Sequence, residues 1–274
     1  MIVDNSRLFR DAMEWYRANY AHVPKWDGIG PLKDKRVIVY CEQGFGDCIH
    51  MARYFHTLQQ QGCHVTLHCP QELETLLAQH VPGVDRTIAK HQHINPQEFD
   101  CHLPSFDLPF VLPVSPNGQC INFRETHPDI AGDKPRLGIA WEGSPHHPNN
   151  HKRCCPLKYF LPLQQSWSLY MLQPSVQDTD LLDGAEDMEL LGVELNDFRD
   201  TARLINSMDA VISVDTAVLH LAGALGKRAI GLLAHDCDPR WLAGQTWYES
   251  VFLLRQKEEY DWDGVFTELS QVIR

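Results

Sequence analysis

Two glycines precede a carboxylate in the segment Gly44-Phe45-Gly46-Asp47. The segment follows a strand-like run, residues 36–41, and opens an apolar-periodic run, residues 47–61, so it reads as a strand, a tight turn and a helix. Glycine lets a backbone approach a ligand closely, and ligands bind at the carboxyl ends of parallel strands. Asp47 is therefore either a helix cap, a catalytic carboxylate or both. The spacing is not G-x-G-x-x-G, which disfavours a nicotinamide cofactor.

A second group of polar residues follows the apolar strand predicted over residues 210–214. Asp215 and Thr216 come directly before a helix that begins near Ala217. Backbone N–H groups and the helix dipole favour a phosphate at such a start. His220 lies one turn beyond Thr216, on the same face. In an isolated helix, the ordinary alternative is that Asp215 caps the helix and His220 packs in the core.

A polar loop, residues 142–153, follows the first strand predicted for the second half of the chain and contains Ser144, Lys152 and Arg153. Arg153 could bind a diphosphate in bidentate fashion and Lys152 as a point charge. The loop histidines have no Cys or carboxylate partner at regular spacing, so we expect no metal site. Gln173, at the end of a later strand, is a candidate contact to the nucleotide.

Composition limits the class of protein. The chain has 274 residues, 43% of them apolar, which predicts two domains of ordinary size. Its 24 basic and 36 acidic residues give a net charge of −12, which disfavours a nucleic-acid partner. The nine cysteines show no C-x-x-C spacing, so we expect reduced, mostly buried thiols. No apolar run is long enough to span a bilayer and no secretory signal pattern is visible, which predicts a cytoplasmic protein without a transmembrane segment.

Strand and helix patterns alternate along the chain and predict an α/β fold with two successive parallel sheets. We expect an N-terminal domain over residues 1–132, beginning with a helix over residues 6–20, and a C-terminal domain over residues 133–274. The region between residues 95 and 133 is rich in proline and has few periodic signals. The other predicted elements are strands at 64–69, 84–89, 136–141, 169–172, 228–233 and 251–254, and helices at 70–80, after Pro156, and at 200–208, 216–225 and 262–273.

The chain resembles bacterial glycosyltransferases related to the ADP-heptose:lipopolysaccharide heptosyltransferases. It is most similar to the catalytic domains that follow tetratricopeptide repeats in many bacterial proteins. The resemblance extends from Pro24 to nearly the end of the chain. The residues that carry it are Pro24-x-Trp26-Asp27-Gly28, Glu42-Gln43-Gly44-Phe45-Gly46-Asp47, Met51-Ala52-Arg53-Tyr54 and Val214-Asp215-Thr216-Ala217-x-x-His220-Leu221-Ala222-Gly223-Ala224-Leu225-Gly226-Lys227.

The resemblance implies the GT-B fold, in which two Rossmann-like domains face a crevice, with the acceptor on the first and the nucleotide sugar mainly on the second. It implies that Asp47 is the general base and that Lys152 or Arg153 stabilises the leaving diphosphate. Thr216 and Ala217 would offer N–H groups to the diphosphate. Asp215 and His220 would hold other donor groups. No metal or other cofactor is obligatory in such enzymes. In proteins of this fold the final helix often crosses back to the first domain.

The acceptor stays open among a saccharide, a lipid-linked glycan and a protein. Three other functions are compatible with the same fold, because fold alone does not fix activity. A nucleotide-sugar epimerase would consume donor without an acceptor. A non-catalytic nucleotide-sugar-binding module would bind donor and release no nucleoside diphosphate. A glycosyltransferase that modifies nucleic acid is disfavoured by the acidic charge balance.

Overall fold

The computed structural model describes residues 19–112, 118–128, 130, 134–145, 147–173, 185, 188–189, 195–242 and 247–273. The chain divides into two compact units, one of residues 1–116 and 120–122 and the other of residues 117–119 and 123–274. Most of the helix predicted over residues 6–20 lies outside the described residues, as does residue 132, near which we expected the domain boundary. No helix within the described residues is long and apolar enough to cross a membrane.

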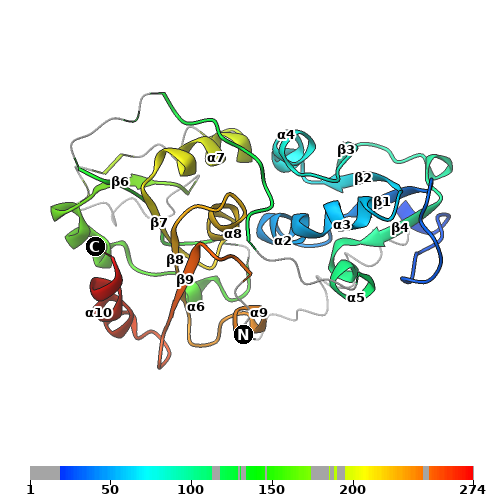
Figure 1. Ribbon diagram of the computed structural model, residues 1–274. Coiled ribbons are helices and arrows are strands. Elements are labelled where there is room, and N and C mark those ends of the chain that lie inside the picture. Colours follow the sequence, from blue (N-terminus) through cyan, green and yellow to red (C-terminus); the bar gives the residue numbers. More distant parts are fainter. Residues whose placement is uncertain are drawn as a thin grey trace. The chain divides into compact units, whose positions relative to one another are not determined.

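The first unit contains a four-stranded sheet in which every neighbouring pair of strands is parallel (Figure 1). The strands have the order β3-β2-β1-β4. Three of them match predicted strands, whereas β4 was not predicted, because its short segment ends in a proline inside the proline-rich region. The bounds are β1 Arg36–Tyr40, β2 His64–Cys69, β3 Arg86–Ala89 and β4 Cys101–Pro104.

The helical segment that follows β1 is interrupted. The single helix predicted over residues 47–61 is replaced by α2 (Phe45–Met51), a 3-10 turn (Ala52–Tyr54) and α3 (Phe55–Gln59). The predicted helix after β2 is confirmed as α4 (Gln71–His80). Two further 3-10 turns, Pro96–Glu98 and Ser105–Asp107, and the short helix α5 (Leu108–Val111) complete this unit among its described residues.

The second unit contains a five-stranded parallel sheet in the order β6-β5-β7-β8-β9. All five strands were predicted within about one residue. Every residue of β7 and β8 is buried, as expected for parallel strands covered on both faces. The bounds are β5 Arg136–Ala140, β6 Ser168–Met171, β7 Ala210–Val214, β8 Ala229–Leu233 and β9 Val251–Arg255.

Helices cover both faces of this second sheet. On one face, α10 packs with Leu137 and Ile139 of β5 in the main core cluster. On the other face, Gly138 leaves room for Met208, which directly follows α7. Gly231 leaves room for Leu219 of α8. The prediction of a helix after Pro156 is wrong, because this segment forms two 3-10 turns, Leu157–Tyr159 and Leu161–Gln165. The helices are α6 Asn150–Arg153, α7 Phe198–Ser207, α8 Ala217–Ala224, α9 Pro239–Leu242 and α10 Trp262–Val272.

The two sheets repeat one ion pair at the amino end of their first strands. Arg36, the first residue of β1, donates to both carboxylate oxygens of Asp100, which comes directly before β4. Arg136, the first residue of β5, binds Asp209 before β7 in the same way. In each pair the arginine backbone N–H also donates to the carboxylate, at 2.8 and 2.7 Å. In each unit the same ion pair therefore joins the first strand to a neighbouring strand, β1 to β4 in the first unit and β5 to β7 in the second.

A buried histidine lies within the first sheet. His68 of β2 is 1% exposed, and its Nδ1 lies 2.5 Å from the hydroxyl of Tyr20. The Tyr20 ring stacks on Tyr40 of β1 with ring centroids 4.2 Å apart. Burial disfavours the charged imidazole and lowers the pKa of His68 to about 4. Folding therefore keeps this side chain neutral at neutral pH.

Acidification should destabilise the first unit through His68. Its pKa is about 6.5 in an unfolded chain and about 4 in the folded protein, so the unfolded state takes up a proton first as the pH falls. We expect His68 to contribute a loss of roughly 2 kcal/mol in the free energy of unfolding between pH 7 and pH 5. Urea unfolding at both pH values measures this loss. His68→Gln should show a loss smaller by that amount, and an equal loss in both proteins would contradict the assignment.

Candidate functional site

Each sheet has one reversal point, at which the chain stops adding strands on one side of its first strand and adds the next strand on the other side. In the first unit this point lies between β1 and β4, and in the second between β5 and β7. Ligands of open α/β sheets bind outside the carboxyl ends of the strands at such points. The predicted residues Gly44 and Asp47 follow β1, whereas Asp215 and Thr216 follow β7. The sequence motifs and the topology therefore indicate the same edge of each sheet.

The turn after β1 holds its carboxylate inside the first helical turn. Helix α2 begins at Phe45 with Gly44 as its N-cap, so Asp47 is the third helical residue and not the cap itself. Oδ2 of Asp47 accepts the backbone N–H of Gly44 at 3.1 Å. Neither Gly44 nor Gly46 has a positive φ, so backbone conformation does not require glycine at these two positions. The expected close approach to a ligand stays a prediction.

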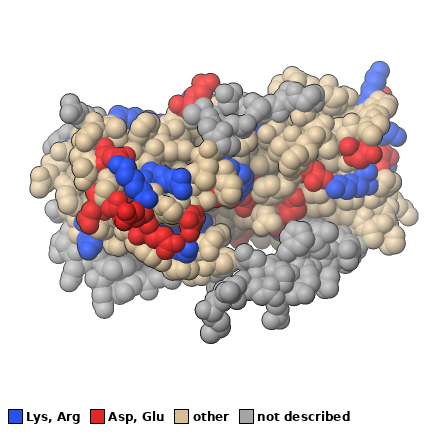
Figure 2. All heavy atoms as spheres, turned by 90° about the horizontal axis from the view of Figure 1, so that it is seen from below, with Lys and Arg blue, Asp and Glu red and all other residues tan. Residues whose placement is uncertain are grey.

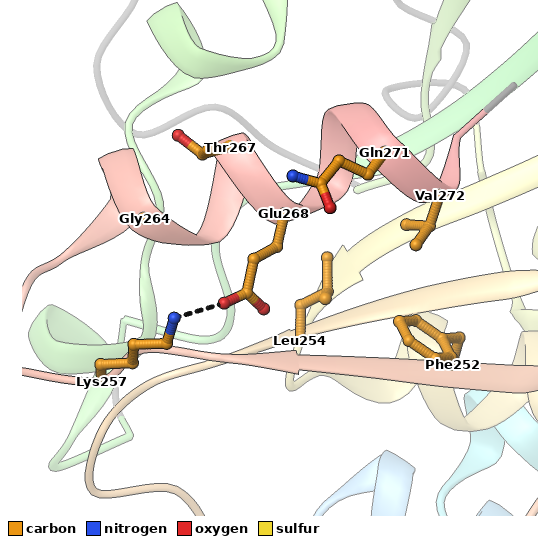
Figure 3. A pocket seen from close by; sticks show the side chains of 8 residues that line it. All are labelled: Phe252, Leu254, Lys257, Gly264, Thr267, Glu268, Gln271 and Val272. Carbon is orange, nitrogen blue, oxygen red and sulfur yellow. Dashed lines mark ion pairs between the residues drawn. The ribbon is translucent and has the colours of Figure 1, made fainter.

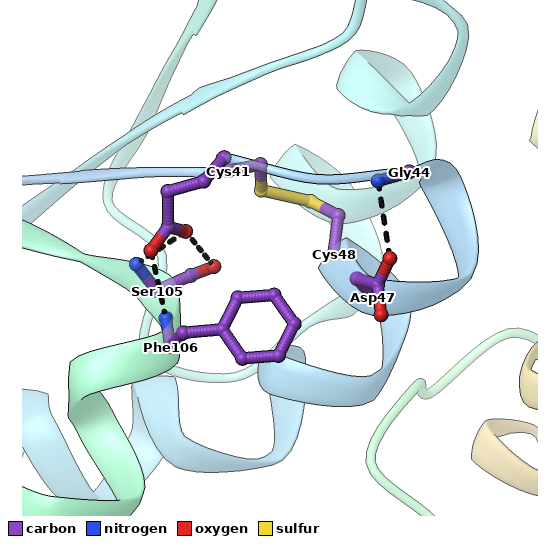
Figure 4. Close-up of a disulfide and its surroundings, with 7 residues drawn as sticks. Cys41, Gly44, Asp47, Cys48, Ser105 and Phe106 are labelled. Carbon is purple, nitrogen blue, oxygen red and sulfur yellow. Dashed lines mark hydrogen bonds between the residues drawn. A yellow bond between two sulfur atoms is a disulfide. The ribbon is translucent and has the colours of Figure 1, made fainter. Parts of the chain in front are cut away.

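Glu42 links this turn to the end of β4. Its carboxylate accepts the backbone N–H and the hydroxyl of Ser105, at 2.9 and 2.6 Å, and the N–H of Phe106 at 3.2 Å (Figure 4). Burial raises the pKa of Glu42, and the three hydrogen bonds oppose that rise. Glu42 therefore joins the two loops at the first reversal point. The sequence marked it only as part of a motif, because Ser105 lies 63 residues further along the chain.

A disulfide closes the same turn, contrary to the expectation that all cysteines are reduced. Cys41, directly after β1, is bonded to Cys48 in α2, and both are buried (Figure 4). The pairing follows from the turn, because the helix brings its first buried residue back beside the strand end, with Cα atoms 5.4 Å apart. The other seven cysteines are free, as predicted, and four of them are buried. The disulfide therefore encloses the whole segment from Glu42 to Asp47.

Removing this disulfide should loosen the first unit. The bond closes a short loop, with a sequence separation of 7, and loop-closure entropy predicts a stabilisation of roughly 2–3 kcal/mol. The double variant Cys41→Ala/Cys48→Ala should unfold in urea with a free energy lower by that amount. Wild-type protein treated with a dithiol reductant is the matched control and should behave like the variant. Identical unfolding of oxidised and reduced wild type would contradict a stabilising disulfide.

In the second unit, the residues after β7 form the start of α8. Thr216 is the N-cap, and its Oγ1 accepts the N–H of Val218 at 3.3 Å and lies 3.0 Å from the hydroxyl of Ser213. Ala217 is the first helical residue. Asp215 precedes the cap, and its side chain is 19% exposed. Burial raises the pKa of Asp215, and a hydrogen bond from the Trp241 side chain opposes that rise.

Arg153 joins the two loops at the second reversal point. Its Nη1 donates to the backbone carbonyl of Asp215 at 2.9 Å, and its Nε donates to Oδ1 of Asn150 at 3.2 Å. A side chain at residue 143, in the loop after β5, would displace this guanidinium, so Gly143 leaves the space that the guanidinium occupies. The guanidinium therefore lies against the start of α8, where the helix dipole also favours an anion. The sequence marked Arg153 but not the role of Gly143.

His220 is held in an aromatic setting one turn into α8. Its ring stacks on Trp241 with centroids 4.9 Å apart, and its Nδ1 lies 3.0 Å from the hydroxyl of Tyr248. Its Nε2 is 3.9 Å from Oδ1 of Asp215. The structure thus brings Asp215, Thr216, Arg153 and His220 together at one helix start. Trp241 and Tyr248 were not predicted, because nothing in their local sequence marks them.

Lys152 has a different environment from its neighbour Arg153. Its Nζ donates to Asp236 at 2.9 Å and to Glu259 at 3.2 Å. These hydrogen bonds raise the pKa of Lys152. Figure 2 shows one face of the molecule on which basic side chains lie beside acidic ones. Lys152 is therefore paired with two carboxylates.

Gln173 and Ser144 lie near the carboxyl end of β5. Gln173 is buried, and its Oε1 accepts the backbone N–H groups of Trp141 and Glu142, at 2.9 and 3.3 Å. Its Nε2 donates to the Glu142 carboxylate at 3.0 Å. These bonds stabilise the conformation of the loop after β5. Ser144 is exposed, and its carbonyl accepts the N–H of His147 at 3.0 Å.

A surface pocket lies away from these residues. A cavity of about 560 Å³ is lined by residues of the edge strand β9, of α10 and of the loop between them, and none of the predicted site residues lines it (Figure 3). Its wall combines the exposed ring of Phe252 with an ion pair between Lys257 and Glu268. Across the described residues, no group of three or more His, Cys, Asp or Glu side chains is arranged to hold a metal ion.

Comparison with known proteins adds to this geometry. Residues 179–259 match the model of glycosyltransferase family 9 (heptosyltransferase), and no curated protein sequence matches the chain. The solved ADP-heptose LPS heptosyltransferase II of E. coli is similar in fold, with a TM-score of 0.62 at 12% identity over 86% of this chain and 98% of that one. A family 9 glycosyltransferase of Veillonella parvula gives a TM-score of 0.62 at 12% identity, covering 90% of this chain and 92% of that one.

A third solved structure is TibC of enterotoxigenic E. coli, described as an iron-containing dodecameric glycosyltransferase. It gives a TM-score of 0.60 at 14% identity over 86% of this chain and 67% of that one. TibC has also been solved in complex with ADP-D-β-D-heptose. The predicted α/β fold of GT-B type and the predicted relation to the heptosyltransferases are confirmed: the chain has their fold, and residues 179–259 carry the sequence signature of glycosyltransferase family 9.

Proposed function

We propose that this protein is a metal-independent glycosyltransferase that moves a sugar from a nucleotide-diphospho sugar to a hydroxyl group. The observation that carries the proposal is the position of Arg153, whose guanidinium lies against the start of α8 and binds the carbonyl of Asp215. A guanidinium and a helix start together favour a diphosphate. The match to glycosyltransferase family 9 covers the segment that contains α8, which supports the same assignment.

In the proposed reaction, Asp47 removes the proton from the acceptor hydroxyl. The acceptor oxygen then forms a bond to the anomeric carbon, and the bond from that carbon to the diphosphate oxygen breaks. Negative charge develops on the leaving nucleoside diphosphate, and fixed donors aimed at that charge lower the barrier. Arg153 and the first N–H groups of α8 are the proposed donors, with Thr216 fixing the helix start through its cap. Lys152 would join them only by leaving Asp236 and Glu259.

Binding of nucleotide sugars tests the proposal directly. ADP-, UDP-, GDP- and CDP-sugars are added to the purified protein with and without EDTA, and thermal unfolding is followed. A ligand at about 100 times its Kd stabilises the native state by roughly 2.7 kcal/mol. ADP-sugars come first, because TibC has been solved with ADP-D-β-D-heptose. We expect one nucleotide to stabilise selectively. No stabilisation by any would refute the proposal, and stabilisation that EDTA abolishes would refute metal independence.

The same preparation separates the transferase from the two related functions. With the donor that binds, a transferase releases nucleoside diphosphate in step with the addition of an acceptor. An epimerase would convert the donor without acceptor. A binding module would be stabilised by the donor and release no diphosphate with a panel of saccharide, lipid-linked glycan and protein acceptors.

A further inference from the structure

The hydroxyl of Tyr248 contacts the inner edge of the His220 ring. Tyr248 is 1% exposed and lies just before β9, whereas His220 is in α8, so the two meet across 28 residues of sequence. The oxygen of Tyr248 is 3.0 Å from Nδ1 of His220. The tyrosine hydroxyl can donate to Nδ1 of a neutral histidine or accept from it, so the charge at the other edge of the ring decides which nitrogen carries the proton.

The fold makes room for this contact. A side chain at residue 223 would collide with the ring of Tyr248, so Gly223, three residues after His220, is what allows Tyr248 to lie against α8. Trp241 stacks on the imidazole at 4.9 Å, with an angle of 27° between the rings. The Tyr248 ring meets the imidazole edge at a centroid distance of 5.9 Å. The position of the imidazole is thus fixed by two neighbouring aromatic rings.

The outer edge of the imidazole faces a carboxylate. Nε2 of His220 is 3.9 Å from Oδ1 of Asp215, which is too long for a hydrogen bond but close enough for charge to matter. A lone pair on Nε2 would face negative charge, whereas an N–H would face it favourably. Asp238 is a second carboxylate near the ring, and Arg153 and Arg240 are cations that interact with Asp215. The carboxylate of Asp215 therefore favours a proton on Nε2, and Nδ1 is then the acceptor that the Tyr248 hydroxyl faces.

We propose that Tyr248 is a positioning residue for donor binding: its hydroxyl donates to Nδ1 of His220 and so holds the imidazole proton on Nε2, directed toward the ligand site in front of Asp215. This inference rests on the proposed function, because the ligand in question is the phosphate or sugar oxygen of the donor. An N–H that already points at the site binds such an oxygen without a change of tautomer. The other tautomer would present a lone pair and repel the oxygen.

The variant Tyr248→Phe tests this proposal, because it removes the hydroxyl and keeps the ring that packs beside Gly223. The first measurement is the nitrogen NMR spectrum of the unliganded protein labelled at histidine, with the His220 signals assigned by their loss in His220→Gln. In wild type, His220 should carry its proton on Nε2. In Tyr248→Phe it should become a mixture of both tautomers. The buried Tyr170 of β6 provides the matched control, Tyr170→Phe, which should leave the His220 signals unchanged.

The second measurement is calorimetric binding of the nucleoside diphosphate. Loss of one hydrogen bond that positions a ligand contact should weaken binding roughly tenfold in Tyr248→Phe, with little change in the melting temperature. A wild-type proton on Nδ1, or a variant with unchanged tautomer and unchanged affinity, would overturn the proposal. If wild type binds no nucleotide, the proposed function fails, and a proton on Nδ1 in the unliganded protein overturns the tyrosine's role separately.

Discussion

Asp47→Asn is expected to lower the rate of sugar transfer by roughly 10²- to 10⁴-fold, the usual contribution of a general base. Asparagine has nearly the same shape as aspartate but cannot accept a proton from the acceptor hydroxyl. Its side-chain oxygen can still accept the N–H of Gly44, as Oδ2 of Asp47 does at 3.1 Å. The first turn of α2 should therefore survive. Binding of the donor nucleotide, measured by calorimetry, should stay within about twofold of wild type, because the proposed contacts to the donor come from the second unit and a lost contact would change the affinity by more than that.

The variant Asp47→Ala separates catalysis from helix capping. It removes both the base and the acceptor for Gly44, and loss of a cap bond costs about 0.5–2 kcal/mol of stability. We expect Asn and Ala to lose transfer equally, whereas only Ala should lower the melting temperature. If Asn lowered stability and donor binding as much as it lowered transfer, Asp47 would be a structural residue and the general base would have to be sought elsewhere.

The repeating elements of both sheets could be predicted from the sequence, because buried parallel strands are continuous apolar runs. The segment Ala210–Val214 is an example, with all five residues buried. Strand β4 could not be predicted, since Cys101–Pro104 is short and lies among prolines. The helix expected over residues 47–61 showed the right periodicity, but local pattern does not reveal the 3-10 turn at Ala52–Tyr54 that divides it.

The members of the candidate site could be named from their motifs, but their contacts could not. Arg153 meets the carbonyl of Asp215 across 62 residues, and no local pattern encodes that distance. The adjacent Lys152 has the same charge but is directed to Asp236 and Glu259. Adjacent residues of a short helix point in different directions. Lys152 and Arg153 therefore have different partners in the structure, although nothing in the sequence distinguished them. The Cys41–Cys48 disulfide was missed for a related reason, because it depends on how the turn folds back.

The difference between these two cations predicts unequal effects on catalysis. Arg153→Gln should lower the rate of transfer by roughly 10²- to 10³-fold, which is the cost of removing one fixed donor to the charge that develops in the transition state. Lys152→Gln should lower the rate by less than about tenfold, since exposed ion pairs such as those of Lys152 contribute little. Steady-state rates at saturating donor and acceptor measure both effects.

Arg153→Lys is the informative control for the arginine. Lysine keeps the positive charge but cannot reproduce the fork that reaches both the carbonyl of Asp215 and the side chain of Asn150. If geometry at the helix start matters, Arg153→Lys should lose nearly as much activity as Arg153→Gln. If charge alone matters, it should retain most of the wild-type rate. A larger loss in Lys152→Gln than in Arg153→Gln would contradict the assignment of Arg153 and would mean that Lys152 leaves its two carboxylates to bind the diphosphate.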